Sequence, residues 1–409
     1  MIRNVREGGE DVGSVGGNPE RLIIVSFDGF RFDYIYRLPV EGNNFLRIIS
    51  GGVWARSGMT NVFSTKTFPN HYSIATGLYE DATGIVMNDV YLQEIGRTVD
   101  VRSDEAETMD TLYLGEPIWV TWIRQHGGNT DGVGAAFWPG SQNRIQGIKM
   151  SHYLTYNVSI PFKDRVDLAI DQWMVKDGVQ LLMMYHNQPD HDGHLYGPDS
   201  PEVDQQLRIV NTELGYLLDK LENHGLLNDT NIMVLSDHGL ATIIGVVSVF
   251  PRPELFEIVV VSDIMLHIRP REGKINQTIQ YLEKLRHAQV WRKEQLPRRW
   301  HYSESDRIMP ILLIPDYGFV IRVIGEDFKN RSGTHGYTID NPTVLPIFAA
   351  RGPAFERNLR LTSANEFANV DIYNVVCAIM GLVPSPNNGS WIRGQRILKK
   401  CYRNLNIQL

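Results

Sequence analysis

The amino-acid sequence predicts an α/β fold in which a mostly parallel sheet is covered by helices on both faces. Short apolar runs, each closed by polar residues, Gly or Pro, recur along the chain, a pattern typical of strands that are buried on both faces. Helical patterns separate these runs, as they do in α/β proteins. Several of the runs end in carboxylate and imidazole side chains. Ligands of such sheets bind beyond the carboxyl ends of the strands, so this edge is the expected site.

Five apolar runs are the predicted strands, and each has the length of an ordinary buried strand. The first, LIIVSFDGF, follows Arg21 and ends in Asp-Gly. The others are VGAAFWPG at 133–140, VQLLMMYH at 179–186, NIMVLSDHG at 231–239 and VLPIFAARG at 344–352.

The clearest helix is predicted over residues 200–225. Ser200 or Asp199 is the expected N-cap, Pro201 stands in the first turn, and Gly225 ends the apolar periodicity. This arrangement of N-cap, proline and terminal glycine is typical of a helix whose two ends are defined by the sequence.

Residues 241–310 differ from the rest of the chain. They are punctuated by proline and read as irregular, with a short amphipathic helix around 275–288 and a basic tract at 292–299. We interpret them as an insertion or cap within a single domain at 21–402, preceded by a disordered leader at 1–20 and followed by a tail at 403–409.

Composition excludes several classes of protein. The chain has 40 Lys and Arg against 47 Asp and Glu, a formal net charge of −7, which argues against a surface that binds nucleic acid non-specifically. Hydrophobic residues are 43% of the total, enough for a full core. No apolar stretch reaches the roughly 18 residues of a membrane span. The two cysteines, Cys377 and Cys401, are compatible with one disulfide or with two free thiols.

Six residues have the chemistry of metal ligands and follow predicted strands or lie in loops. Taken singly, each has an ordinary explanation: Asp28 caps the turn after the first strand, and His335 is a loop histidine. Together they would be a costly group of like charges unless cations lay among them. Carboxylate oxygens and imidazole nitrogens suit zinc, and this number of ligands indicates two zinc ions: Asp28, Asp190, His194, Asp237, His238 and His335.

The segment TKTFPNHYSIATGLY at 65–79 predicts a phosphate site. Pro69 is expected to open a helix whose N-terminal amides point back toward Thr67. A metal-bound hydroxyl at that position would be an activated nucleophile. The alternative is that Thr67 only caps the helix.

Eight segments together resemble the ectonucleotide pyrophosphatase/phosphodiesterase family, the type I phosphodiesterases of the alkaline phosphatase superfamily. The resemblance runs in order from about Arg21 to Cys401 and is greatest to the short members that consist of a catalytic domain alone. It implies an alkaline-phosphatase-like sheet with a small cap insertion. The segments are VSFDGFRFDY, TKTFPNHYSIATGLYEDATGIVMND, FWPGS, PDHDGHLYGP, LSDHGL, SDRIMPILLIPDYGF, GTHGY and SPNNGSW.

The resemblance implies a role for each matching residue. Thr67 matches the nucleophile, and Asn88 matches a residue that binds the developing oxyanion together with a backbone amide beside Thr67. One zinc would be held by Asp190, His194 and His335, and the other by Asp28, Asp237, His238 and Thr67. Phe68, Tyr156 and Tyr196 match the aromatic residues that stack on the base, although any lone aromatic can equally be a core residue.

The implied function is a dinuclear zinc hydrolase for nucleotide phosphodiester and pyrophosphate bonds. It would act as a monomer on nucleotides or dinucleotides, through a covalent phosphothreonine intermediate, and release nucleoside 5′-monophosphates. One alternative is a hydrolase of lysophospholipids or choline phosphodiesters, and another is a catalytically silent extracellular binding module. Retention of all three aromatic residues favours nucleotides, and retention of every ligand and of Thr67 favours an enzyme.

The sequence departs from the family pattern at several points. Thr83 stands where a histidine is usual, and Thr334 where an aspartate often precedes the late histidine. Both changes are expected to weaken the orientation of neighbouring groups. Residues 241–300 lack the cysteines of vertebrate relatives, which leaves only a Cys377–Cys401 bridge.

The compartment is expected to be extracellular or the secretory pathway. Family members are mostly secreted or anchored at membranes, and five sequons point the same way. The first twenty residues show no apolar signal region. The sequons begin at Asn157, Asn228, Asn276, Asn330 and Asn388.

Overall fold

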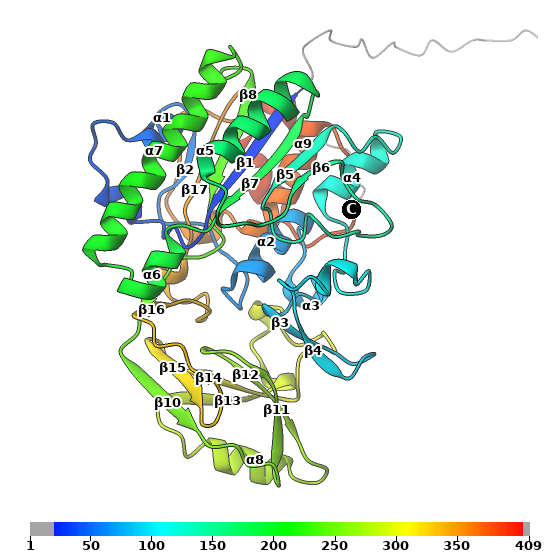
Figure 1. Cartoon of the computed structure of the whole chain (residues 1–409), viewed down its shortest axis with the longest axis vertical. Helices are drawn as coiled ribbons and strands as arrows, with labels where there is room; N and C mark the ends of the chain where they lie inside the picture. Colours follow the sequence, from blue (N-terminus) through cyan, green and yellow to red (C-terminus); the bar gives the residue numbers. More distant parts are fainter. Residues whose placement is uncertain (1–19, 404–409) are drawn as a thin grey trace, which may run out of the picture.

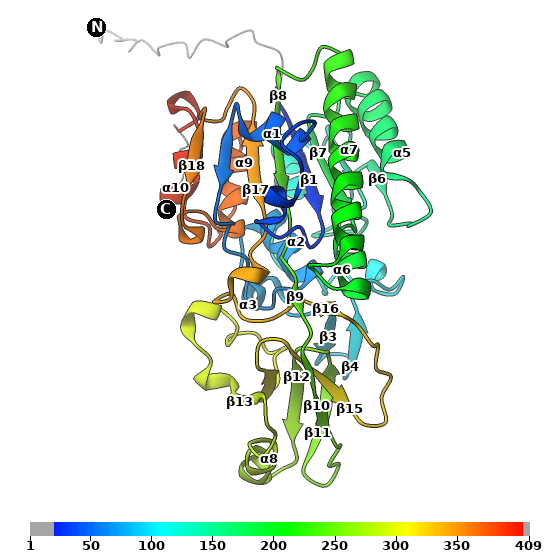
Figure 2. The same cartoon turned by 90° about the vertical axis from the view of Figure 1, so that its left-hand side faces the viewer.

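The computed structural model describes residues 20–403. The leader expected at 1–20 and the tail expected at 403–409 lie outside the described residues, apart from Glu20 and Arg403. Two lobes are stacked along the long axis of the molecule (Figure 1), and α6, β9 and β16 lie between them (Figure 2).

The larger lobe is built on an eight-stranded sheet in the order β18-β2-β17-β8-β1-β7-β5-β6. The strands β8, β1, β7, β5 and β6 pair in parallel, as do β2 and β18. This confirms the predicted α/β class with a mostly parallel sheet. The strands are β1 Arg21–Phe27, β2 Val53–Ala55, β5 Val133–Ala136, β6 His152–Leu154, β7 Leu181–His186, β8 Thr230–Leu235, β17 Phe348–Arg351 and β18 Leu359–Leu361.

All five predicted strands belong to this sheet, but β17 runs against the others. Phe348 pairs with Leu235 and Arg351 with Ile232, in an antiparallel register. The residues that precede β17 therefore lie at the edge where the parallel strands end. An apolar run gives no indication of strand direction, so the sequence could not predict this. The strands β2, β6 and β18 were not expected, because three residues are too few for a pattern.

Helices cover both faces of the sheet, and β1 shows why. Alternate residues of a strand point to opposite faces, so Ile23 and Val25 join one core while Leu22 and Ile24 join the other. Figure 2 shows α5 and α7 on one side of the sheet. The first core contains α1 Asn44–Ile49, α5 Phe162–Asp167 and α7 Pro201–Asn223; the second contains α2 Thr67–Thr76, α4 Ile118–Gln125 and α9 Ile372–Met380.

The long helix α7 begins as predicted. The Ser200 side chain accepts a hydrogen bond from the Val203 amide, and Pro201 is the first helical residue. The amphipathic helix expected at 275–288 is also present but shorter: α8 spans Ile275–Leu282. Three further short helices are α3 Glu80–Thr83, α6 Asp190–Tyr196 and α10 Trp391–Gly394.

The smaller lobe corrects the expectation of an irregular cap. It contains an antiparallel sheet in the order β11-β12-β14-β13 and a parallel pair, β10 with β15. Its apolar residues form a core of their own with α8. Two of the pairings, β12 with β14 and β10 with β15, join segments that are far apart in sequence, which hid them from local patterns. The strands are β10 Gly245–Val249, β11 Phe256–Val261, β12 Leu266–Pro270, β13 Ala288–Arg292, β14 Ile311–Pro315 and β15 Phe319–Val323.

Two short ribbons complete the described chain. The hairpin of β3 Asp89–Leu92 and β4 Arg97–Asp100 is antiparallel, and β16 Gly333–Thr334 pairs with β9 Ala241–Thr242. No helix among residues 20–403 combines the length and the apolar composition needed to cross a bilayer.

The two cysteines are free thiols. Cys377 is buried within α9, whereas Cys401 is exposed at the surface. A side chain enclosed in the core cannot reach a surface sulfur without displacing its neighbours, so the bridge that the resemblance left available is not formed.

Candidate active site and metal centre

The structure brings the six expected ligands together in two clusters. Asp28, Asp237 and His238 follow β1 and β8, and all three are buried. Asp190 and His194 lie one turn apart on α6 and are joined by His335, which follows β16. Within each cluster the ligand atoms lie within 4.8 Å of one another.

The imidazole rings face carboxylate oxygens through Nε2. His238 Nε2 lies 3.2 Å from Asp28 Oδ1 and 3.0 Å from Asp237 Oδ2. In the second cluster, Asp190 faces His194 Nε2 at 3.4 Å and His335 Nε2 at 3.6 Å. The rings of His238 and His335 stack with centroids 3.5 Å apart, so the two clusters are adjacent.

The other ring nitrogen of each histidine is held by the backbone. His194 Nδ1 lies 2.8 Å from the carbonyl oxygen of Gly333. His238 Nδ1 lies 2.9 Å from that of Gly239, and His335 Nδ1 lies 2.6 Å from that of Thr65. A carbonyl only accepts, so Nδ1 of each ring carries a proton, and Nε2 is the nitrogen directed at the cluster. Metal-binding histidines are oriented in the same way.

Buried oxygen atoms in both clusters have no hydrogen-bond partner among the described residues: Asp28 Oδ1, Asp190 Oδ1 and Asp237 Oδ2. Such atoms are rare in folded proteins and need an explanation. Burial, reinforced by the charges of Asp237 and Asp190, raises the pKa of Asp28 well above its usual value. Divalent cations at the clusters would satisfy these oxygens and cancel the repulsion, so the residues present fit two metal ions.

The protonation of two histidines agrees with this interpretation. Burial lowers the pKa of His194. Burial and then the charges of His238 and Lys66 lower the pKa of His335 well below its usual value. Both rings are therefore neutral at physiological pH, which is the form that binds metal.

Thr67 is the first residue of α2, and Lys66 occupies the cap position without a capping side chain. The helix thus begins two residues before Pro69, where it was expected to open, and Thr67 is not its N-cap. The Thr67 Oγ1 atom lies 3.4 Å from His238 Nε2. The hydroxyl that the sequence singled out is therefore beside the buried cluster.

Asn88 also lies at the start of α2. Its Oδ1 atom accepts a hydrogen bond from the Phe68 amide at 3.2 Å, which directs its Nδ2 donor away from that amide. The backbone amide beside Thr67 is thus hydrogen-bonded to Asn88 in this structure, and the role of the two groups in binding an oxyanion stays a prediction.

The geometry of the site agrees with three comparisons of the chain with known proteins. Residues 22–338 match the family described as type I phosphodiesterase/nucleotide pyrophosphatase. The chain belongs to this family. Members of the family hydrolyse phosphoric diesters.

Relatives in the family span most of the chain. Human ectonucleotide pyrophosphatase/phosphodiesterase family member 5 is 34% identical over 399 residues, which cover 95% of this chain and 80% of the human protein. Mouse bis(5′-adenosyl)-triphosphatase is 37% identical over 388 residues, covering 90% and 79%.

Solved structures of the murine family member 5 have the same fold. One aligns with a TM-score of 0.85 at 34% identity, covering 93% of this chain and 100% of the murine chain. Another, of an inactive variant in which threonine is replaced by alanine, contains AMP and aligns with a TM-score of 0.84.

The three aromatic residues expected at the family's base-binding positions do not form one stack. Tyr156 and Tyr196 are each about half exposed, whereas Phe68 packs against the core. The Tyr156 ring lies 5.3 Å from that of Phe137. Within residues 20–403, no ring pair joins Phe68, Tyr156 and Tyr196 to one another.

Two positions that depart from the family pattern have different surroundings. The Thr83 hydroxyl is buried and bonds only within its own turn, to the Glu80 carbonyl and the Ile85 amide. The Thr334 hydroxyl donates instead to Asp263 Oδ2 at 2.6 Å. The threonine at position 334 therefore connects the segment of His335 with the smaller lobe.

Sequence reasoning missed residues that support the ligands. His71 lies one helical turn after Thr67, and its Nδ1 is 2.8 Å from the Thr67 carbonyl oxygen. The Tyr185 hydroxyl donates to Asp28 Oδ2 at 2.5 Å. The spacing of four residues from Thr67 could have identified His71, but no local signal identifies Tyr185.

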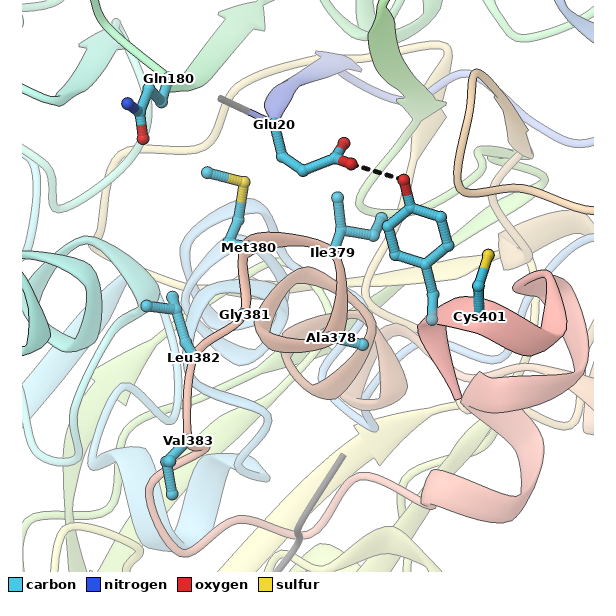
Figure 3. Close-up of a pocket in the computed structure, with 10 residues that line it drawn as sticks. Glu20, Gln180, Ala378, Ile379, Met380, Gly381, Leu382, Val383 and Cys401 are labelled. Carbon is cyan, nitrogen blue, oxygen red and sulfur yellow. Dashed lines mark hydrogen bonds between the residues drawn. The ribbon is translucent and has the colours of Figure 1, made fainter. Parts of the chain in front are cut away.

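A pocket at the opposite end of the parallel strands is separate from this site. It has a volume of about 470 Å³ and is lined by Ala378–Val383, Gln180 and Tyr402, whose hydroxyl donates to Glu20 (Figure 3). Glu20 and Gln180 precede β1 and β7, so the pocket lies at the amino ends of the parallel strands. The metal clusters lie at their carboxyl ends.

Proposed function

We propose that this chain is a monomeric dinuclear zinc hydrolase that cleaves nucleotide phosphodiester and pyrophosphate bonds and releases nucleoside 5′-monophosphates. One observation carries the proposal: two adjacent ligand clusters contain orphaned buried oxygens, and the Thr67 hydroxyl lies beside one of them. The catalytic unit would be residues 21–402, with 241–310 as its cap.

The reaction requires a nucleophile, a group that binds developing charge, and a leaving group aligned with the nucleophile. The proton of Thr67 Oγ1 would pass to solvent, and Oγ1 would attack phosphorus. An O–P bond to the nucleotide would form as the leaving oxygen departs with the electron pair of its own bond to phosphorus. Asn88 Nδ2 would donate to a non-bridging oxygen in the transition state. Zinc ions held by the two clusters would lower the pKa of the hydroxyl and neutralise the phosphate oxygens.

The second half of the reaction regenerates the threonine. Water would attack the phosphorus of this nucleotidyl-threonine from the side that the leaving group vacated, the bond from phosphorus to Thr67 Oγ1 would break, and a water proton would return to Oγ1. The products are a nucleoside 5′-monophosphate and the free hydroxyl of Thr67. The murine relative supports this route, because its threonine-to-alanine variant is described as inactive and binds AMP.

Nucleotides are the proposed substrates because an aromatic surface adjoins the site. Tyr156 is 49% exposed and Tyr196 52% exposed, so both rings are available for stacking on a base. Tyr156 also lines a shallow groove formed by residues 153–160. The related triphosphatase is named for a substrate with two adenosyl groups, which agrees with this chemistry.

The Thr67→Ala variant tests the proposal. We expect turnover of the nitrophenyl ester of thymidine 5′-monophosphate to fall by at least about 10⁴-fold, as when other covalent nucleophiles are removed. Zinc content should remain at two per chain, and Thr67→Ser should retain measurable activity. A Thr67→Ala protein with a near-native rate would overturn the covalent route, and preferred turnover of nitrophenylphosphocholine would favour the choline-phosphodiester alternative.

We propose further that the protein works in the secretory pathway or outside the cell. The asparagine residues of all five sequons are exposed, so a glycan can be attached to each of them without a clash with the core. Production in a secreting eukaryotic host, followed by enzymatic removal of N-glycans, should decrease the apparent mass. No change in mass would contradict glycosylation at these positions.

A further inference from the structure

Asp263, in the loop between β11 and β12 of the smaller lobe, reaches into the active site of the larger lobe. Its Oδ1 atom lies 3.1 Å from Lys66 Nζ, and its Oδ2 atom accepts the hydrogen bond from Thr334 Oγ1 at 2.6 Å. Lys66 directly precedes Thr67, and Thr334 directly precedes His335. A single carboxylate therefore contacts the neighbours of the candidate nucleophile and of a candidate metal ligand.

Asp263 also faces a second cation. Arg331 Nη1 lies 3.8 Å from Asp263 Oδ2 and 3.5 Å from Nδ1 of His194. The Lys66 side chain is almost fully buried, and that of Asp263 is 23% exposed. Two positive side chains are thus held close to the cluster of Asp190, His194 and His335, with one carboxylate between them.

The carboxylate is ionised at neutral pH. Burial acts to raise the pKa of Asp263, but the Lys66 ammonium, the Thr334 hydroxyl and the Arg331 guanidinium outweigh burial and lower it. An ionised Asp263 offsets charge from Lys66 and Arg331. Without it, both cations would repel a divalent ion at the adjacent cluster, and charges in a largely buried site are weakly screened.

We propose that Asp263 is a positioning residue for the cluster of Asp190, His194 and His335. Its carboxylate neutralises Lys66 and Arg331 and anchors Thr334, and in this way it allows the cluster to bind its metal ion tightly. The smaller lobe is then a necessary part of the metal centre as well as a cap. This inference rests on the proposed function only in requiring that the cluster binds a divalent ion.

The first test is the Asp263→Asn variant of the full chain, which keeps the shape of the side chain and removes its charge. Zinc affinity is measured by competition with a chromophoric chelator, without any substrate. One of the two zinc ions should bind about 10–100-fold more weakly, the usual effect of losing a group that supports a metal site. The matched control is Asp316→Asn, an exposed carboxylate of the same lobe, which should leave both affinities unchanged.

A charge rescue separates this role from simple packing. Adding Lys66→Met to Asp263→Asn removes the cation that was left unneutralised, so zinc affinity should return to within a few-fold of the original. Loss of a packing contact would not be repaired by a second truncation. Thr334→Ser should keep zinc affinity because it keeps the hydroxyl, whereas Thr334→Val should weaken it.

Steady-state kinetics with the nitrophenyl nucleotide diester provide another readout. At zinc concentrations below saturation, Asp263→Asn should lower kcat, and excess zinc should restore most of it. Unchanged zinc affinity in Asp263→Asn, or a loss that Lys66→Met does not rescue, would overturn the proposal. If Asp263→Asn fails to fold, the zinc affinities of Thr334→Val and Thr334→Ser are compared instead. Equal zinc affinities in these two variants would overturn the proposal. A wild-type chain that binds two zinc ions and cleaves no diester would overturn the proposed function and leave this inference standing.

Discussion

The two ligand clusters of this protein are built in different ways. Asp28, Asp237 and His238 follow central strands of the large sheet and are almost completely enclosed. Asp190 and His194 lie on a seven-residue helix between the lobes, and their side chains remain 14% and 13% exposed. The first cluster is held by the rigid frame of the sheet, whereas the second also depends on contacts made by the smaller lobe.

We propose that this difference separates two tasks within one site. The enclosed cluster adjoins Thr67, so it is placed to act on the nucleophile. The more exposed cluster lies between the lobes, and we propose that ions and leaving groups would enter and depart on this side. The enclosed cluster would hold the reacting atoms precisely. The more exposed cluster would adjust as products are released.

The largest expected effect is a loss of kcat on changing a residue next to Thr67. Asn88→Ala removes the side chain that contacts the Phe68 amide at the start of α2 and that is proposed to bind transition-state charge. We expect kcat to fall by about 10²–10³-fold, as on removal of other oxyanion donors, while zinc affinity at both clusters is kept. Kinetics and zinc titration check this, with the exposed amide Gln93→Ala as control. Weakened zinc binding would show that Asn88 supports the ligands instead.

A smaller effect should distinguish the clusters directly. Tyr185→Phe removes the hydroxyl that donates to Asp28 Oδ2 at 2.5 Å. Zinc at the enclosed cluster should bind about 10–100-fold more weakly, whereas the other site should be unaffected. Competition with a chelator measures both affinities, and Tyr216→Phe, whose hydroxyl bonds to Asp167, is the matched control. Equal weakening at both sites would mean that the clusters are not independent.

The smallest effect is on the stability of the metal-free chain. Because the pKa of Asp28 is raised in the folded state, the folded chain retains a proton there that the unfolded chain loses above about pH 4. Metal-free stability should therefore fall as pH rises through this range, and Asp28→Asn should escape that loss. Each 1 kcal/mol corresponds to about 1 °C in Tm for a chain of this size, because the entropy of unfolding grows with chain length.

The measurement is thermal unfolding in excess chelator at several pH values. The difference in Tm between Asp28→Asn and wild type should widen as pH rises above about 4. Added zinc should reverse the order, because the variant lacks a ligand. The exposed Asp131→Asn serves as control. A constant difference across pH would show that repulsion at the enclosed cluster is already relieved without metal.

Much of the enclosed cluster could be predicted from the sequence. Asp28, Asp237 and His238 follow apolar runs that were recognisable as strands, and parallel strands bring their carboxyl ends to one edge. His335 is different, because it precedes β17, which runs antiparallel. Its place in the site came from the resemblance of the GTHGY motif to the family and could not be derived from the local pattern.

The smaller lobe shows where the sequence was least informative. Residues 241–310 were interpreted as irregular, yet they contribute most of a four-stranded sheet with its own core. Strand β12 pairs with β14, more than 40 residues later in the chain. Neither that pairing nor the position of Asp263 leaves a periodic signal, because both depend on the path of the chain.

The sequence by itself determined the local elements and the chemistry available to them: the buried runs, the capped helix α7, the oxygen and nitrogen ligands, and a threonine at the start of a helix. These depend on residues within a few positions of one another. Only the tertiary structure decided which groups meet. Asp263 contacts Thr334 across 71 residues and Lys66 across 197, and the stacking of His238 on His335 depends on a strand direction that short-range preferences do not encode.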